Sequence, residues 1–145
     1  MATTLTGRCH CGNLTLTFET RHRPEELPVW ECGCSFCRRH GARTTSDPEG
    51  RVSIRIRDPA QLARYRFGLA TADFLVCRRC GVYLAAVIPA DHENGARATV
   101  NVTALDAADR LTHPPAPVAY GAESADERRA RRRSNWTPVV AFVEG

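Results

Sequence analysis

The sequence predicts a mainly β fold in which short strands and a few short helices are held together by zinc. Two observations carry this prediction. Several segments alternate apolar and polar residues with a period of two, as half-buried strands do. Two close cysteine pairs are each followed at once by glycine, at residues 9–12 and 77–81. Such a pair is typical of a zinc knuckle at the tip of a hairpin, because glycine lets the backbone turn through positive φ and point N–H groups at the sulfurs.

The first half of the chain contains two clear strands and one predicted helix. Residues 3–20 form a hairpin around the first knuckle, with apolar residues alternating over 14–18. The same alternation returns at residues 52–56. Asp58 and Pro59 are typical of a helix start, with the aspartate as N-cap and proline in the first turn. We therefore expect a short helix after Asp58, with its apolar side formed by Leu62 and Tyr65.

Around the second knuckle the pattern of the first is repeated. We expect residues 74–76 to enter this knuckle as a strand and residues 82–88 to leave it as another. Residues 98–103 alternate again and predict a further strand, followed by a turn or one helical turn at 105–110. The proline-rich segment 113–117 must be stiff and extended, at the surface or along a sheet edge.

A helix and a strand are expected at the end of the chain. Ser124 and Glu127 have the spacing of a capping box, so residues 124–133 are predicted to be helical. Residues 139–143 are apolar and long enough for a strand. The segment 38–50 is polar and is expected to be a loop or a single helical turn.

Seven cysteines are the most specific feature of the sequence. A structural zinc needs four ligands and one knuckle supplies two, so the two knuckles are expected to pair. The structural zinc site would then consist of Cys9, Cys11, Cys77 and Cys80. The pairing would join two hairpins that are distant in sequence.

The other three cysteines are Cys32, Cys34 and Cys37. Three protein ligands and one open position distinguish a catalytic zinc from a structural one, so we expect a catalytic site here. Two alternatives remain open. His40 could close a structural Cys3His site, or Cys34 and Cys37 could form a redox pair without metal.

Length and composition favour one metal-binding domain over residues 1–145. The chain is 43% hydrophobic, enough for one core, and no apolar run approaches the ~18 residues of a membrane span. The N-terminus lacks the apolar core of a signal peptide, which predicts a cytoplasmic protein with reduced cysteines. The net charge of +4, carried by arginine in the absence of any lysine, fits a small anionic substrate. We expect no nucleic-acid partner and no membrane partner.

The arginine-rich run at residues 128–133 allows three interpretations. It could bind nucleic acid, it could be the solvated face of a helix, or some of its arginines could hold a substrate carboxylate. We favour the solvated face, because the chain lacks the aromatic-interleaved basic motif of single-strand binders.

Taken together, the cysteine pattern resembles the glutathione-dependent formaldehyde-activating enzyme family, also called S-(hydroxymethyl)glutathione synthases. The order is Cys-x-Cys-Gly, then Cys-x-Cys-x-x-Cys with a basic pair and Gly-Ala, then Cys-x-x-Cys-Gly. The resemblance covers roughly residues 7–110 and includes Leu105-Asp106, which leaves residues 111–145 as a carboxy-terminal extension.

This resemblance implies a fold, a reaction and roles for the cysteines. The family fold is a set of small sheets in a β-tent arrangement, with one structural and one catalytic zinc held by the two cysteine groups named above. The reaction joins formaldehyde to the thiol of glutathione, and its reverse makes the enzyme a carbon–sulfur lyase. Glutathione carries two carboxylates, which Arg38, Arg39 or Arg43 could bind because they follow the catalytic cysteines in sequence.

The sequence also allows a second class of function, binding without catalysis. The chain could be a non-catalytic binding module, stabilised by zinc and presenting a basic carboxy-terminal helix. That module would have a closed second metal site and salt-dependent binding to polyanions.

Overall fold

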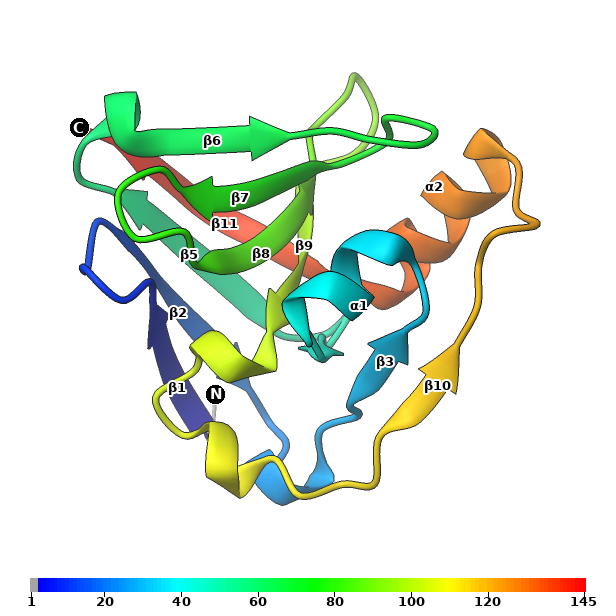
Figure 1. Ribbon diagram of the computed structural model, residues 1–145. Helices are drawn as coiled ribbons and strands as arrows, with labels where there is room; N and C mark the ends of the chain where they lie inside the picture. Colours follow the sequence, from blue (N-terminus) through cyan, green and yellow to red (C-terminus); the bar gives the residue numbers. More distant parts are fainter. Residues whose placement is uncertain (1–2) are drawn as a thin grey trace.

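The computed structural model describes residues 3–145 and is mainly β, as predicted (Figure 1). An 11-stranded sheet and two α-helices make up its regular structure, together with short 3-10 turns. In chain order the strands and helices are β1 (Thr3–Arg8), β2 (Leu14–Thr20), β3 (Trp30–Cys32), α1 (Ser35–His40), β4 (Thr44–Thr45), β5 (Arg51–Ile56), β6 (Leu62–Tyr65), β7 (Asp73–Cys77), β8 (Tyr83–Ile88), β9 (Arg97–Asn101), β10 (Ala116–Val118), α2 (Ala125–Asn135) and β11 (Thr137–Glu144).

The two knuckle hairpins form as predicted. β1 and β2 pair antiparallel from Thr3–Thr20 to Arg8–Thr15, and the first knuckle is their turn. β7 and β8 pair antiparallel around the second knuckle. The predicted alternation of β2 is visible in its burial, because every second residue from Leu14 to Thr20 is buried and the others are half-buried.

The sheet folds over where β11 passes from one part to the other. The first residues of β11, Thr137 and Pro138, pair antiparallel with β9. The strand then continues parallel to β5, from Val139–Val52 to Glu144–Ile56, with a register shift between Val139 and Ala141. One strand therefore belongs both to the layer β1-β2-β5 and to the layer that contains β7, β8 and β9 (Figure 1). This folded sheet agrees with a tent-like arrangement.

The three cysteines Cys32, Cys34 and Cys37 lie at one edge of the sheet, at the end of β3 and in the first turn of α1. β3 pairs with the two-residue strand β4, which in turn pairs with β9. On its other side β3 pairs parallel with β10, so the proline-rich segment ends along a sheet edge, one of the two places expected for it. α1 follows β3 after two residues and lies in front of the sheet (Figure 1).

The prediction of a helix after Asp58 is wrong over most of its length. Asp58 does cap a turn, since its side chain accepts a hydrogen bond from the N–H of Ala60, but the turn is 3-10 and ends at Gln61. Leu62–Tyr65 form β6, which pairs antiparallel with β7. Long-range pairing with β7 decides the structure of this segment, and local propensity does not.

The carboxy-terminal helix is confirmed together with its cap. The Ser124 hydroxyl accepts from the N–H of Glu127, and the Glu127 carboxylate accepts from the N–H of Ser124. α2 begins at Ala125 and ends at Asn135, where β11 follows almost immediately. Within residues 3–145, neither helix has the length and hydropathy that crossing a bilayer requires.

Two apolar clusters fill the molecule. The larger one lies under both knuckle hairpins and includes the buried Cys9 and Cys77. The smaller one contains Cys37, Tyr83 and Trp136, so it joins α1, β8 and the end of α2. The second cysteine group is thus part of a distinct, aromatic-rich core.

Candidate metal centres and the adjoining cavity

The two knuckles bring their four cysteines to one point. The sulfur atoms of Cys9, Cys11, Cys77 and Cys80 all lie within 4.8 Å of one another. The Sγ–Sγ distance is 3.7 Å for Cys9 and Cys11 and 3.5 Å for Cys11 and Cys77. A tetrahedral zinc with Zn–S bonds near 2.3 Å separates its sulfurs by about 3.8 Å. The spacing therefore fits one such ion.

Backbone N–H groups favour thiolates at this site. Gly12 and Gly81 have φ values of 82° and 81°, the left-handed conformation that each knuckle requires. The N–H of Leu14 lies 3.2 Å from the Cys9 sulfur. Burial raises the pKa of Cys80, but hydrogen bonds from the backbone N–H groups of Cys11 and Val82 and from the thiols of Cys77 and Cys9 together lower it to about 6. Burial raises the pKa of Cys9 and Cys77 at the same site, so deprotonation of these two ligands requires a bound cation.

The second cysteine group is assembled by β3 and the first turn of α1. Cys32 ends β3, Cys34 is the N-cap of α1, and Cys37 lies one turn further on; their sulfurs are within 4.8 Å of one another. The N–H of Cys37 donates to the Cys34 sulfur at 3.4 Å. Hydrogen bonds from the thiols of Cys32 and Cys37 lower the pKa of Cys34, which favours a thiolate at this position.

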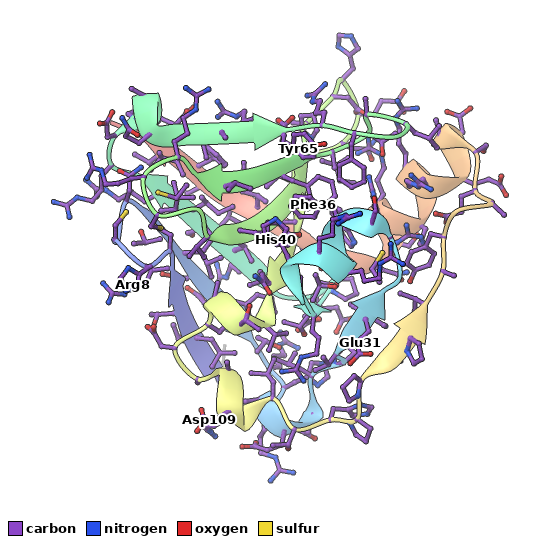
Figure 2. All side chains as sticks on the ribbon, in the orientation of Figure 1. Arg8, Glu31, Phe36, His40, Tyr65 and Asp109 are labelled. Carbon is purple, nitrogen blue, oxygen red and sulfur yellow. The ribbon has the colours of Figure 1, made fainter. Side chains whose placement is uncertain are left out.

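His40 is not part of this group. Among residues 3–145, the cluster of sulfurs at this place consists of the three cysteines. The ring of His40 packs instead against Phe36 at a tilt, with centroids 4.4 Å apart, and the two side chains lie next to each other on α1 (Figure 2). The structure therefore does not support the closed Cys3His alternative.

The three cysteines form part of the wall of a cavity of about 340 Å³. That volume lies in the range of small-molecule sites. Aromatic residues and three arginines make up much of the remaining wall. The lining residues are Trp30, Cys32, Gly33, Cys34, Cys37, Thr44, Phe67, Phe74, Tyr83, Ala86, Thr99, Val118, Ala119, Tyr120, Gly121, Arg128, Arg131, Arg132, Asn135 and Trp136.

Tyr83 places a free hydroxyl group beside the second cysteine group. Its side chain is 2% exposed and lines the cavity, and its Oη has no hydrogen-bond partner within residues 3–145. Burial raises the pKa of this phenol, and negative charge on the nearby cysteine sulfurs raises it further. Tyr83 therefore remains protonated at neutral pH, and its hydroxyl is a hydrogen-bond donor without a partner among the described residues.

The arginines of α2 face the cavity more than solvent, which corrects the expectation of a solvated helix face. Arg128, Arg131 and Arg132 all line the cavity, and Arg132 is buried. The carboxylate of Glu123 binds Arg131 at 2.8 Å and 3.0 Å and Arg128 at 3.4 Å. Of the predicted run only Arg129 is exposed on the helix surface.

The three arginines expected near the substrate lie elsewhere. Arg38 and Arg39 are exposed on α1, and Arg43 is half-buried between α1 and β4. None of the three is among the residues that line the cavity. Their assignment to substrate stays a prediction from sequence proximity.

Fold and sites together define a mainly β protein with two groups of cysteines that could each hold a metal ion, one of them beside a cavity. The chain belongs to the glutathione-dependent formaldehyde-activating enzyme family, whose model matches residues 4–120. Its structure is also similar to a crystal structure of a Rhodobacter sphaeroides protein. That protein is 30% identical, with a TM-score of 0.55, and the match covers 78% of this chain and 99% of that one.

Proposed function

We propose that the protein is a zinc-dependent carbon–sulfur lyase that joins a small aldehyde such as formaldehyde to the thiol of glutathione, and catalyses the reverse cleavage. One observation carries the proposal: Cys32, Cys34 and Cys37 form one wall of a cavity that can admit a small molecule. A metal held there would face substrate space. Membership of the formaldehyde-activating family supports the same reaction.

The two cysteine groups have different roles in this proposal. Cys9, Cys11, Cys77 and Cys80 hold a structural zinc between the two hairpins. Cys32, Cys34 and Cys37 hold the second zinc, which when bound supplies an open coordination position that favours the thiolate form of the substrate thiol. We place the protein in the cytoplasm, where the thiols stay reduced.

The side chains around the cavity contribute to the reaction directly. As the sulfur electron pair forms the C–S bond, the carbonyl π pair moves to the aldehyde oxygen, which then needs a hydrogen-bond donor. We assign that donor to the hydroxyl of Tyr83, because the residue lines the cavity and its Oη has no partner in residues 3–145. The thiol loses one proton and the oxygen gains one, so the product is the hydroxymethyl thioether with no other co-reactant.

Apolar residues in the wall keep bulk water away from the reacting groups. Phe74 and Trp136 are buried, and Trp30 and Phe67 are half-buried around the same space. In such surroundings the hydrogen bond from Tyr83 is stronger than it would be in water.

The contrasting function, a binding module with a basic helix, is less well supported. Arg128 and Arg131 are engaged by Glu123 and Arg132 is buried, so α2 does not offer an extended basic surface. Polyanion binding requires exposed cations that can reach phosphates.

Exchange spectroscopy by NMR tests the proposal. The method follows the exchange of glutathione and formaldehyde with their adduct, and we expect the zinc-loaded protein to accelerate this exchange. Cys34→Ser should abolish the acceleration and release one zinc, as measured by native mass spectrometry. Ser35→Ala, an exposed neighbour on α1, is the matched control and should retain both. Two tightly held zincs without any acceleration would contradict the proposal.

A further inference from the structure

Arg132 is a buried cation that lacks a counter-ion. Its side chain is 8% exposed, and no ion pair formed within residues 3–145 includes it. Nη1 donates to the Thr71 hydroxyl at 2.6 Å, while the buried Nε has no partner in that part of the chain. A buried charge without a partner is costly, so its retention at the wall of a cavity indicates that a ligand completes it.

The neighbouring arginines do not remove this excess charge. Arg128 and Arg131 share the single carboxylate of Glu123, and Arg132 does not pair with it, so one carboxylate serves the three cavity-lining guanidinium groups. Among the lining residues, taken from positions 3–145, none has a carboxylate side chain. Burial lowers the pKa of Arg132 to about 10, with Arg131 and Arg128 adding to the effect, but the group remains protonated at neutral pH.

The guanidinium of Arg132 is also held in place before any ligand arrives. It stacks over the ring of Trp136 at 4.7 Å and is anchored to Thr71 by its hydrogen bond. Next to it, the guanidinium of Arg131 lies 3.4 Å over the ring of Tyr120. A fixed planar donor costs little entropy on binding and favours a planar, two-oxygen acceptor.

We infer that Arg132, supported by Arg128 and Arg131, forms a carboxylate-binding subsite at the α2 side of the cavity. The subsite selects thiol substrates that carry a carboxylate, and it positions the thiol toward the cysteine group in the same cavity. The identity of the thiol rests on the proposed function, whereas the carboxylate site rests on the buried guanidinium alone. α2 begins after residue 120, where the family match ends, so the subsite lies outside the matched segment.

Calorimetric titration with a sulfur-free probe tests this subsite separately from the chemistry. The probe is γ-glutamyl-alanyl-glycine, which is glutathione with hydrogen in place of the thiol group. We expect Arg132→Gln to weaken its binding at least about tenfold, the usual effect of losing a hydrogen bond to a charged group. The exposed Arg129→Gln, on the same helix, is the matched control and should change binding less than about twofold.

Two further measurements keep the test decisive if Arg132→Gln does not fold. On the unmodified protein, the diethyl ester of the probe should bind at least about tenfold more weakly than the free acid. Arg132→Lys, which keeps the charge but loses the planar fork, should give an intermediate affinity. Equal affinity for acid and ester, or no binding of the acid at all, would overturn the inference.

The same titration distinguishes failure of the subsite from failure of the proposed reaction. Arg132-dependent binding of the probe, without any acceleration of formaldehyde exchange, would support the subsite and remove the proposed function. Accelerated exchange by the unmodified protein, together with unchanged probe affinity in Arg132→Gln, would support the proposed function and remove the subsite. If Arg132→Gln loses zinc from the cysteine group while probe binding is unaffected, the arginine balances the metal site and the subsite is overturned.

Discussion

The carboxylate of Glu123 accepts two parallel hydrogen bonds from the guanidinium of Arg131, from Nε to Oε2 at 2.8 Å and from Nη2 to Oε1 at 3.0 Å. This pair links the segment before α2 to the helix itself, and the Arg131 guanidinium in turn covers the ring of Tyr120. Arg128 also donates to the backbone carbonyl of Tyr120 at 2.8 Å. One wall of the cavity is therefore organised by a single carboxylate.

We expect Glu123→Gln to weaken this wall in a pH-dependent way. The hydrogen bond from Arg131 is the main cause that lowers the pKa of Glu123 below its ordinary value of 4.5. A lowered folded-state pKa contributes stability that is present above the unfolded-state pKa and lost as the pH falls through the folded-state value. Thermal unfolding should show the variant destabilised by about 1 kcal/mol at pH 7, and the difference should shrink as the pH falls toward the folded-state pKa of Glu123.

Asp126→Asn is the control for this experiment. Its carboxylate is 97% exposed and pairs with Arg129 across one helical turn, so the unfolding temperature should not change measurably. If Glu123→Gln and Asp126→Asn have the same effect at pH 7, the Glu123–Arg131 pair does not stabilise the cavity wall.

Tyr83→Phe should separate activity from stability. The Tyr83 hydroxyl has no partner in residues 3–145, so its removal leaves no unsatisfied group behind, and the free energy of unfolding should stay the same or rise by up to about 1 kcal/mol. The loss of the donor to the aldehyde oxygen should slow formaldehyde exchange about a hundredfold. Urea unfolding and exchange spectroscopy measure the two effects.

A parallel change at Tyr65 controls for loss of a phenol group in general. Tyr65 is 51% exposed, stacks near Phe36 and is not among the residues that line the cavity (Figure 2). Tyr65→Phe should leave both stability and exchange unchanged. A Tyr83→Phe protein that exchanges at the unmodified rate would remove Tyr83 from the mechanism.

The two cysteine groups should respond differently to a single serine. Cys80→Ser removes one ligand of the site that joins two hairpins of the larger core, and metal binding at such a site is part of the folding free energy. We expect its unfolding midpoint to fall by about 10 °C or more, or no folded protein at all. Cys34→Ser, in contrast, should keep the fold while losing one zinc, as circular dichroism and native mass spectrometry would show. Similar behaviour of both variants would contradict the division into structural and catalytic sites.

Much of the fold could be predicted because local sequence patterns, namely hydrophobic periodicity, cysteine spacing and helix capping, specify it. Alternation of apolar and polar residues identified β2, β5 and β9, the knuckles identified the flanking strands β1, β7 and β8, an apolar run identified β11, and the capping box identified α2. β6 was mistaken for a helix because a four-residue strand with one buried residue has no clear period, and its pairing with β7 is not visible in its own sequence. The two-residue β4 was missed for the same reason, since it exists only through its neighbours.

The candidate sites, too, could be predicted from the sequence only in part. Both cysteine groups could be predicted, because ligand type and spacing are local features and because four ligands must be assembled from two pairs. Tyr83 and Arg132 were not singled out. In sequence, Tyr83 reads as a core residue of a strand, and Arg132 is one of five arginines in a short run. What distinguishes them is the absence of a partner for a buried polar atom, and only the tertiary structure shows it.

The final prediction concerns Asp47, which ties three distant parts of the sheet together. Its carboxylate accepts from the Thr20 hydroxyl at 2.6 Å and from the N–H of Glu49 at 2.9 Å, and its own N–H donates to the Thr137 hydroxyl. Thr20 ends β2, and Thr137 begins β11 at the point where the sheet folds over. Asp47 is 5% exposed and both threonines are fully buried.

We expect Asp47→Ala to destabilise the protein by about 2–4 kcal/mol, because it leaves the buried Thr20 hydroxyl without its acceptor and removes a charge-assisted bond. Glu49→Ala, its exposed neighbour, should cost less than about 0.5 kcal/mol. Thr20→Val combined with Asp47→Ala completes a double-mutant cycle, measured by urea unfolding. A coupling free energy of at least about 1 kcal/mol is expected for this contact. Additive effects would instead mean that Asp47 stabilises the fold through its backbone turn, since Glu49 donates to the same carboxylate independently of Thr20.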